Sequence, residues 1–140
     1  MKVMAKMDKQ MIDTLYKKAL EVRENAYVPY SDFRVGAALL TEDGEIYLGA
    51  NVENASYSLS ICAERNAIFK ANADGKRKFK ALMVVADTER PISPCGACRQ
   101  VMAEFGDYDV YLANLKGDIK EATSFELLPY NFNKEDMDEK

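Results

Sequence analysis

The sequence predicts a three-layer α/β/α domain with a five-stranded mixed sheet, and three observations lead to that prediction. Helical and extended patterns alternate along the chain in the order α-β-β-α-β-α-β-β. The run Ala81–Asp87 is apolar up to its last residue, as expected of a strand covered by helices on both faces. The last two strands are joined by too few residues for a parallel crossover, so that pair must be antiparallel if it is adjacent.

The first helix and the hairpin after it have clear boundary signals. Asp8 is a suitable N-cap for a helix whose apolar residues recur at helical spacing as far as Ala26, and Pro29 prevents its continuation. Two strands should follow, because Asp43-Gly44 between two apolar runs is a strong hairpin signal.

The third helix should begin with Ser93 as its N-cap and Pro94 at its first position. The chain shows no repeat or linker, so we expect one domain over residues 1–140, with residues 133–140 a frayed charged tail. After the first helix, the expected elements are strands at Phe33–Thr41 and Ile46–Ala50, a helix at Cys62–Ala73, a strand at Ala81–Asp87, a helix ending near Phe105, strands at Asp109–Ala113 and Ile119–Ala122, and a helical turn at Phe125–Leu128.

Composition and charge argue against several classes of protein. Hydrophobic residues make up 48% of the chain and the net charge is −4, which is ordinary for a globular protein and unlike one that tracks a phosphate backbone. The run Lys76-Arg77-Lys78 is interpreted as a solvated loop. Because the net charge is negative, we expect no nucleic-acid partner. The apolar stretches are too short for a membrane span or a secretory signal, so we expect no membrane partner and a cytoplasmic location.

All three cysteines fall into one pattern, and the chain has no histidine. The pattern is Cys62-Ala63-Glu64 followed by Pro94-Cys95-Gly96-Ala97-Cys98. Zinc would therefore rest on three thiolates, which leaves the fourth tetrahedral position open to water, as in a catalytic site. Glu64 would then carry protons beside that water. Three ordinary core cysteines, a structural zinc site or a redox role are the alternatives.

The cysteines also stand at predicted helix starts. Backbone N–H groups and the helix dipole there favour thiolate over thiol, and Cys95 and Cys98 share one helix face. Zinc with three thiolates carries a net negative charge, so other groups must withdraw charge from the sulfurs. Arg65 and Arg99 directly follow site residues and are candidate donors to the sulfurs, the alternative being two surface arginines.

Over nearly its whole length the chain resembles the small homotetrameric cytidine deaminases of nucleoside salvage. C-x-E followed by P-C-x-x-C is the signature of zinc deaminases that use a non-ligand glutamate. The first ligand position is histidine in some relatives and cysteine in the homotetrameric branch, as here. The stretches that support the resemblance are 27–31, 33–38, 51–57, 62–65, 93–100 and 127–129.

The resemblance implies zinc-dependent hydrolytic deamination of cytidine and 2′-deoxycytidine to uridine and 2′-deoxyuridine, with release of ammonia. One Zn²⁺ per subunit would present hydroxide to C4, and Glu64 would shuttle protons. A homotetramer, with active sites completed by neighbouring subunits, is implied as well. The expected substrate-binding residues are Asn51 and Glu53 at the ribose, Phe33 along the pyrimidine, Ala63 through its backbone, Tyr57 with Tyr30 near subunit contacts, and Phe132 over the base from a neighbour.

Simpler interpretations exist for several of these residues. Asn51 and Glu53 are also ordinary loop polars, and Tyr30, Tyr57 and Phe132 are also ordinary packing residues. For the whole protein, the alternatives are a blasticidin S deaminase-like enzyme, a polynucleotide deaminase or other nucleic-acid-binding protein, and a non-catalytic module stabilised by zinc.

Overall fold

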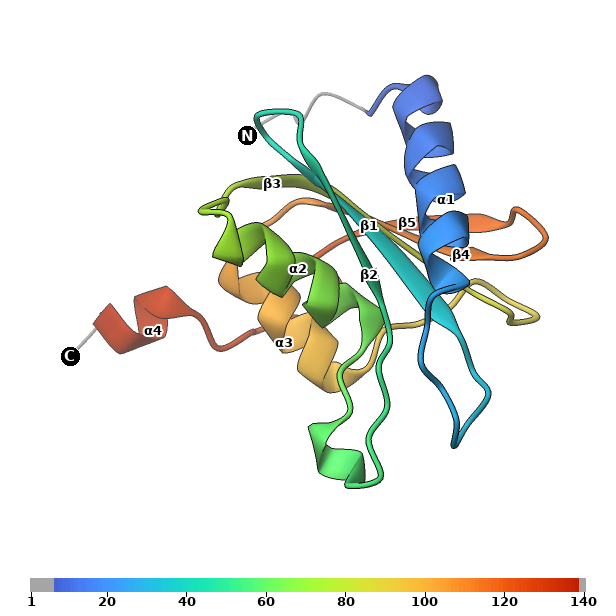
Figure 1. Cartoon of the computed structure of the whole chain (residues 1–140). Coiled ribbons are helices and arrows are strands. Elements are labelled where there is room, and N and C mark those ends of the chain that lie inside the picture. The colour runs from blue at the N-terminus through green and yellow to red at the C-terminus, as the bar shows by residue number, and fades with distance from the viewer. Residues whose placement is uncertain (1–6, 139–140) are drawn as a thin grey trace.

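The computed structural model describes residues 7–138, and the order of its elements agrees with the predicted order (Figure 1). The expected three-layer α/β/α architecture is confirmed. Within the described residues, the α-helices are α1 (Lys9–Arg23), α2 (Ala63–Ala73), α3 (Gly96–Glu104) and α4 (Lys134–Asp138), and a short 3-10 helix, η1, spans Tyr57–Leu59. The strands are β1 (Val35–Thr41), β2 (Ile46–Ala50), β3 (Phe79–Ala86), β4 (Asp109–Asn114) and β5 (Ile119–Thr123).

The five strands form one mixed sheet in the order β2-β1-β3-β4-β5. β3 and β4 are parallel, because α3 provides the crossover between them. β4 and β5 are antiparallel, with Asp109 opposite Thr123 and Ala113 opposite Ile119, which confirms the expected final pair. The short connection between them leaves no room for a helix, so the chain turns directly back.

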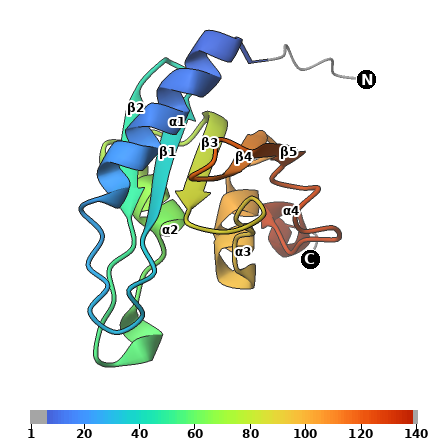
Figure 2. The same cartoon turned by 90° about the vertical axis from the view of Figure 1, so that its right-hand side faces the viewer.

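Helices cover both faces of the sheet (Figures 1 and 2). α1 packs on one face, where Leu15 and Ala19 join a core with Met83 and Val85. α2 and α3 lie side by side on the other face, which is built around Leu82, Val84 and residues of both helices. Alternate residues of β3 thus enter opposite cores, which explains why its sequence is apolar almost throughout.

Two glycines allow the helices to lie directly on strand backbones. A Cβ at Gly36 would stand 2.0 Å from the carbonyl oxygen of Ala19 in α1. A Cβ at Gly49 would stand 2.3 Å from the carbonyl oxygen of Ala63, the first residue of α2. Such distances are impossible for real Cβ atoms, so only glycine permits this packing. Gly49 therefore fixes how the start of α2 sits on β2.

The start of α1 agrees with prediction, whereas its end does not. The Asp8 side chain accepts a hydrogen bond from the backbone N–H of Gln10, as an N-cap does. The helix ends at Arg23, so Ala26 lies in the following loop although it is buried there. Tyr27 next to it forms a bridge with Val52, and this tertiary pairing ends the helix before Pro29 is reached.

The start of α3 also differs from prediction. Cys95 is the N-cap, and Pro94 precedes the helix instead of opening it. The Ser93 hydroxyl, expected to cap the helix, accepts a hydrogen bond from Arg99 at 2.8 Å. Ser93 Oγ, the atom that would accept a backbone N–H in a serine N-cap, thus accepts from the Arg99 guanidinium instead.

The C-terminal segment corrects two expectations. Residues 125–128 form turns instead of a turn of helix. The described part of the charged tail forms the short helix α4, whose first turn is capped because Asn133 Oδ1 accepts from the Glu135 N–H at 2.9 Å. Residues 139–140 of that tail lie outside the described residues. No helix within residues 7–138 is long and apolar enough to cross a membrane.

Candidate metal centre

The three cysteines come together at the starts of α2 and α3. Cys62 Sγ lies 3.9 Å from Cys95 Sγ, which lies 3.5 Å from Cys98 Sγ. All three sulfurs lie within 4.8 Å of one another. Cys98 is buried, Cys62 is partly buried and Cys95 is exposed, so the cluster sits at the surface end of the α2–α3 contact.

The spacing of the sulfurs fits a tetrahedral zinc ion. Zinc–thiolate bonds of about 2.3 Å place neighbouring sulfurs of a regular tetrahedron about 3.8 Å apart. The observed separations of 3.9 and 3.5 Å bracket that value without any movement of the backbone. Three soft thiolates suit zinc, and they leave one coordination position for a water molecule. The residues present therefore fit the expected metal.

The surroundings of Cys62 favour a thiolate over a thiol. A hydrogen bond from Cys98, followed by one from Arg65, lowers the pKa of Cys62 to about 5 although burial opposes the change. The same hydrogen bond to Cys62 raises the pKa of the Cys98 thiol well above its ordinary value. The cluster therefore favours a negative charge at Cys62, and a bound dication would displace the protons of the other thiols.

Glu64 is buried beside the sulfurs at the second position of α2. It is only 4% exposed, although acidic side chains are rarely buried. Burial raises the pKa of Glu64 to about 7, and the negative charge on Cys62 adds to the increase. The carboxyl group can therefore both accept and release a proton near neutral pH.

Arg65 contacts a sulfur, as the sequence predicts. Its Nη2 lies 3.4 Å from Cys62 Sγ, one helical turn after that cysteine. The thiolate in turn raises the pKa of the guanidinium, which stays charged. A guanidinium in this position can withdraw charge from the Cys62 sulfur.

The hydrogen bonds of Arg99 lead elsewhere. Its guanidinium donates to the Pro94 carbonyl at 2.9 Å, to Ser93 Oγ at 2.8 Å and to the Leu127 carbonyl at 2.8 Å. Helical spacing explains why Arg99 does not contact a sulfur. Cys98 occupies the position in α3 that Arg65 occupies in α2, and Arg99, one residue later, lies about 100° further around the helix. Arg99 therefore holds the loop before Cys95 and not a sulfur.

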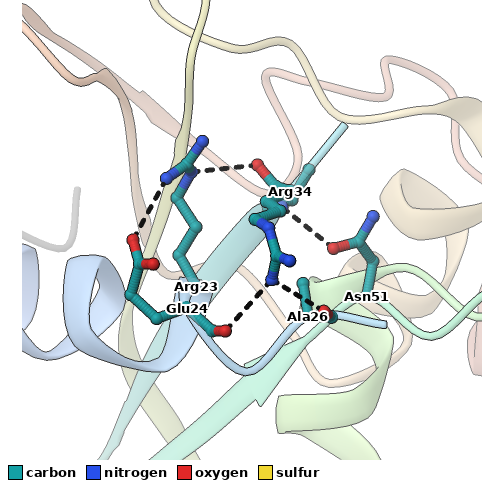
Figure 3. A network of polar contacts seen from close by, with 6 residues as sticks. Arg23, Glu24, Ala26, Arg34 and Asn51 are labelled. Carbon is teal, nitrogen blue, oxygen red and sulfur yellow. Dashed lines mark hydrogen bonds and ion pairs between the residues drawn. The ribbon is translucent and has the colours of Figure 1, made fainter. Parts of the chain in front are cut away.

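Asn51 lies where β2 ends, close to the start of β1. Its Oδ1 accepts from the Val35 N–H at 2.9 Å (Figure 3). Its Nδ2 donates to the Phe33 carbonyl at 2.8 Å. Arg34 anchors the same loop by donating to the Ala26 carbonyl at 2.8 Å. The sequence analysis did not predict a role for Arg34, although its position directly before the apolar strand that begins at Val35 is a signal that could have indicated one.

Glu53 holds the tip of the neighbouring loop. Its Oε1 accepts from the N–H groups of Tyr30 and Ser31, both at 3.1 Å, and its Oε2 accepts from the Ser31 hydroxyl. The hydroxyl contact lowers the pKa of Glu53 below its ordinary value. The carboxylate borders a hollow of about 310 Å³ that is also lined by Tyr30, Ser31, Tyr57 and Ser60. Ser31 is a site residue that the sequence analysis did not name.

Most of the other expected substrate-binding side chains lie at the surface. Phe33 is 38% exposed, Tyr57 75% and Phe132 58%, so none of them is an ordinary core residue in the single chain. Tyr30 and Tyr57 meet edge to face, with ring centroids 6.0 Å apart. Ala63 is fully buried as the first residue of α2.

The basic run lies away from the sulfurs, in the loop between α2 and β3. Lys76 pairs with Asp43 across 2.5 Å, and Arg77 donates to the Asn72 carbonyl at 3.0 Å. These residues border a hollow of about 510 Å³, larger than the one at Glu53, but no cysteine lines it. The size of a hollow is therefore a poor guide to the chemistry here.

Comparison with known proteins agrees with this geometry. Residues 9–114 match the family model of the cytidine and deoxycytidylate deaminase zinc-binding region. The chain is 62% identical over 128 residues to a cytidine deaminase of Sporosarcina psychrophila, which covers 90% of this chain and 94% of the relative. A solved cytidine deaminase from Burkholderia pseudomallei has a TM-score of 0.84 at 52% identity, over 86% of this chain and 98% of that one.

A relative that is named for a different substrate has a lower sequence identity to this chain. A blasticidin-S deaminase of Bacillus cereus is 29% identical over 108 residues, which cover 71% of this chain and 77% of the relative. The matched region of the family model includes all three cysteines and Glu64. The chain therefore belongs to the cytidine and deoxycytidylate deaminase family.

Proposed function

We propose that this protein catalyses zinc-dependent hydrolytic deamination of cytidine and 2′-deoxycytidine to uridine and 2′-deoxyuridine. One observation supports this above all others: three sulfurs at zinc-ligand spacing lie beside a buried glutamate of raised pKa. Both relatives of high identity described above are named cytidine deaminases. We infer that the whole chain acts as one domain.

The chemistry is divided between the metal and Glu64. When bound to the three thiolates, zinc supplies a Lewis acid that activates a water molecule for attack at C4 of the pyrimidine. Glu64 would take one proton from the water and deliver it to N3, and would then pass the proton of the new C4 hydroxyl to the amine, so that ammonia leaves as the C4 carbonyl forms. Burial raises the pKa of Glu64 and so opposes permanent ionisation of the carboxyl group, which suits this alternation.

The loops at the end of the sheet would hold the nucleoside. Asn51 and Glu53 lie two residues apart at the end of β2, and their polar groups would bind the ribose 3′-hydroxyl. Phe33, whose carbonyl is held by Asn51, would line the pyrimidine, and Ala63 would present backbone groups to the base. The bonds that Asn51 and Glu53 make within the chain fix these loops in advance, which lowers the entropic cost of binding.

Neighbouring subunits would complete the site. Tyr30, Tyr57 and Phe132 are large and exposed, and in a homotetramer such side chains would be covered. We place the enzyme in the cytoplasm, where a reducing environment keeps the three thiols free for metal.

The test is loss of the ultraviolet absorbance of cytidine during incubation with purified protein, beside a chelator-stripped sample. We expect turnover of cytidine and deoxycytidine that disappears on stripping and returns with zinc. Blasticidin S serves as the competing substrate, and we expect it to remain unchanged. Turnover of blasticidin S with no turnover of cytidine would contradict the proposal, as would zinc-loaded protein that deaminates neither compound.

A further inference from the structure

Two consecutive residues of α3 connect the metal-ligand loop to the C-terminal segment. Arg99 donates to Pro94 and Ser93, directly before the ligand Cys95, and to the carbonyl of Leu127 in the C-terminal segment. Gln100 Nε2 donates to the Phe132 carbonyl at 2.6 Å, five residues further along that segment. Arg99 and Gln100 are the two residues that follow the ligand Cys98 in the sequence.

Cys95 is the ligand that depends most on this support. It is the exposed cysteine of the three, and as N-cap of α3 its side chain makes no capping hydrogen bond. Cys98, in contrast, is buried in the core cluster and fixed by packing. Of the side chains in the described part of the chain, Arg99 is the one that hydrogen-bonds both residues preceding Cys95.

One guanidinium serves both segments, and this makes them interdependent. The guanidinium is a rigid planar fork, so its donors keep fixed directions relative to one another. A shift of Leu127 that rotates the fork also misaligns the bonds to Pro94 and Ser93. Leu127 additionally packs against the core cluster that contains Cys98, so the segment and the ligands share a second contact.

We propose that Arg99 is a positioning residue for the Cys95 zinc ligand, and that it couples zinc retention to docking of the C-terminal segment 125–133, with Gln100 as an auxiliary tether. This rests on the proposed function, because it requires that the three cysteines bind zinc. Coupling of this kind is reciprocal: if docking of the segment retains zinc, then zinc must hold the segment docked.

Reciprocity gives a test that needs no variant. Hydrogen exchange of the amides in 125–133 is measured in the wild-type protein, zinc-loaded and chelator-stripped. We expect exchange there to be at least about tenfold faster without zinc, whereas β4, which is in the core, changes little. Equal exchange in the two forms would overturn the proposed coupling.

The second measurement is the rate of zinc release to a chromogenic chelator. Arg99→Lys keeps the charge but loses the fork, and we expect release to accelerate about 10- to 100-fold, as when groups that orient metal ligands are removed. Gln100→Ala should accelerate it by a smaller factor, because Arg99 still holds Leu127. Arg99→Lys should also reduce the effect of zinc on exchange in 125–133, and what remains reflects Gln100 and the packing of Leu127.

Two matched controls separate positioning from general loosening. Arg77→Lys alters another arginine that donates to a carbonyl, but at the far end of α2, and should leave zinc release unchanged. Tyr108→Phe removes a buried hydrogen bond to Met102 in α3 and should lower the melting temperature without accelerating zinc release.

The outcomes also separate this inference from the proposed function. Wild-type protein that binds no zinc would contradict both. Wild-type protein that binds zinc and deaminates cytidine, with an Arg99→Lys variant that releases zinc at the wild-type rate, would overturn the positioning role alone.

Discussion

The starts of α2 and α3 have nearly the same local geometry and serve different purposes. Each helix has a cysteine N-cap in extended conformation, Cys62 with ψ 156° and Cys95 with ψ 166°, and neither side chain makes a capping bond. Three residues later the helix returns to the same face. At that position α2 has Arg65, 3.4 Å from the Cys62 sulfur, and α3 has Cys98, 3.5 Å from the Cys95 sulfur.

This single difference assigns the two helices their roles. α3 would supply two ligands, and its arginine, displaced by one position, holds the surrounding loop. α2 would supply one ligand, and it also carries Arg65, which contacts that sulfur, and the buried Glu64. In the proposed function α3 therefore mainly binds the metal, whereas α2 also carries the acid–base chemistry.

The largest expected effect comes from removing the chemistry of α2 while keeping the metal. Glu64→Ala should lower the rate of cytidine deamination by at least about 10²–10⁴-fold, the range typical of a general acid–base group. Zinc content should stay at one ion per chain, because the carboxyl is not a ligand. Steady-state kinetics and metal analysis on the same sample provide the check, and a zinc-loaded variant with full turnover would refute the role of Glu64.

The raised pKa of Glu64 predicts how stability depends on pH. A carboxyl group with a pKa near 7 in the folded state and near its ordinary value when unfolded keeps its proton longer in the folded state. Folding stability is therefore lost as pH rises through that interval. In zinc-free protein, Glu64→Gln removes this loss and should raise the free energy of unfolding relative to wild type, by about 2–3 kcal/mol more at pH 8 than at pH 5.

Urea unfolding of both proteins at the two pH values measures this difference. A gap between variant and wild type that stays constant from pH 5 to pH 8 would show that burial does not perturb the carboxyl.

Glycine substitutions should distinguish the two helix starts by their packing. Gly49→Ala places a Cβ 2.3 Å from the Ala63 carbonyl and should lower the free energy of unfolding by about 1–3 kcal/mol, because backbone must move. Gly96→Ala in α3 meets nothing within 4 Å and should change it by less than about 0.5 kcal/mol. Chemical denaturation measures both, and equal losses would contradict the difference in packing.

The two arginines should differ in their effect on sulfur. Arg65→Gln removes the positive charge beside Cys62 and shortens the side chain, and should raise the pKa of that thiol. Arg99→Lys should leave the pKa of Cys62 unchanged, because Arg99 contacts the loop. Titration of the thiolate ultraviolet absorbance in zinc-free protein compares the two variants, and equal shifts would mean that both arginines act on the sulfur.

The sequence could predict what depends on local pattern. Alternating hydrophobicity, the Asp8 cap and the Asp-Gly turn specified the elements, and the short last connection specified the antiparallel strand pair. The helical spacing of three residues correctly placed Cys95 near Cys98. Arg65, a candidate because it directly follows Glu64, lies near Cys62. These features involve residues close together in the chain, for which spacing determines geometry.

Predictions that depended on distant partners were less reliable. The helix α1 ends early because Tyr27 pairs with Val52, and Ser93 does not cap α3 because Arg99 uses its hydroxyl. Arg99 itself was expected at a sulfur, but its third donor is directed to Leu127, 28 residues away. No local pattern reveals such a partner, because it depends on where the C-terminal segment crosses α3.

We propose that the starts of α2 and α3 supply three thiolates to one zinc ion and leave its fourth coordination position open. X-ray absorption at the zinc edge of the loaded protein tests it most directly. We expect three sulfur neighbours at about 2.3 Å and one lighter atom, oxygen or nitrogen, at about 2.0 Å. Four sulfur neighbours, or fewer than three, would contradict the open three-thiolate site.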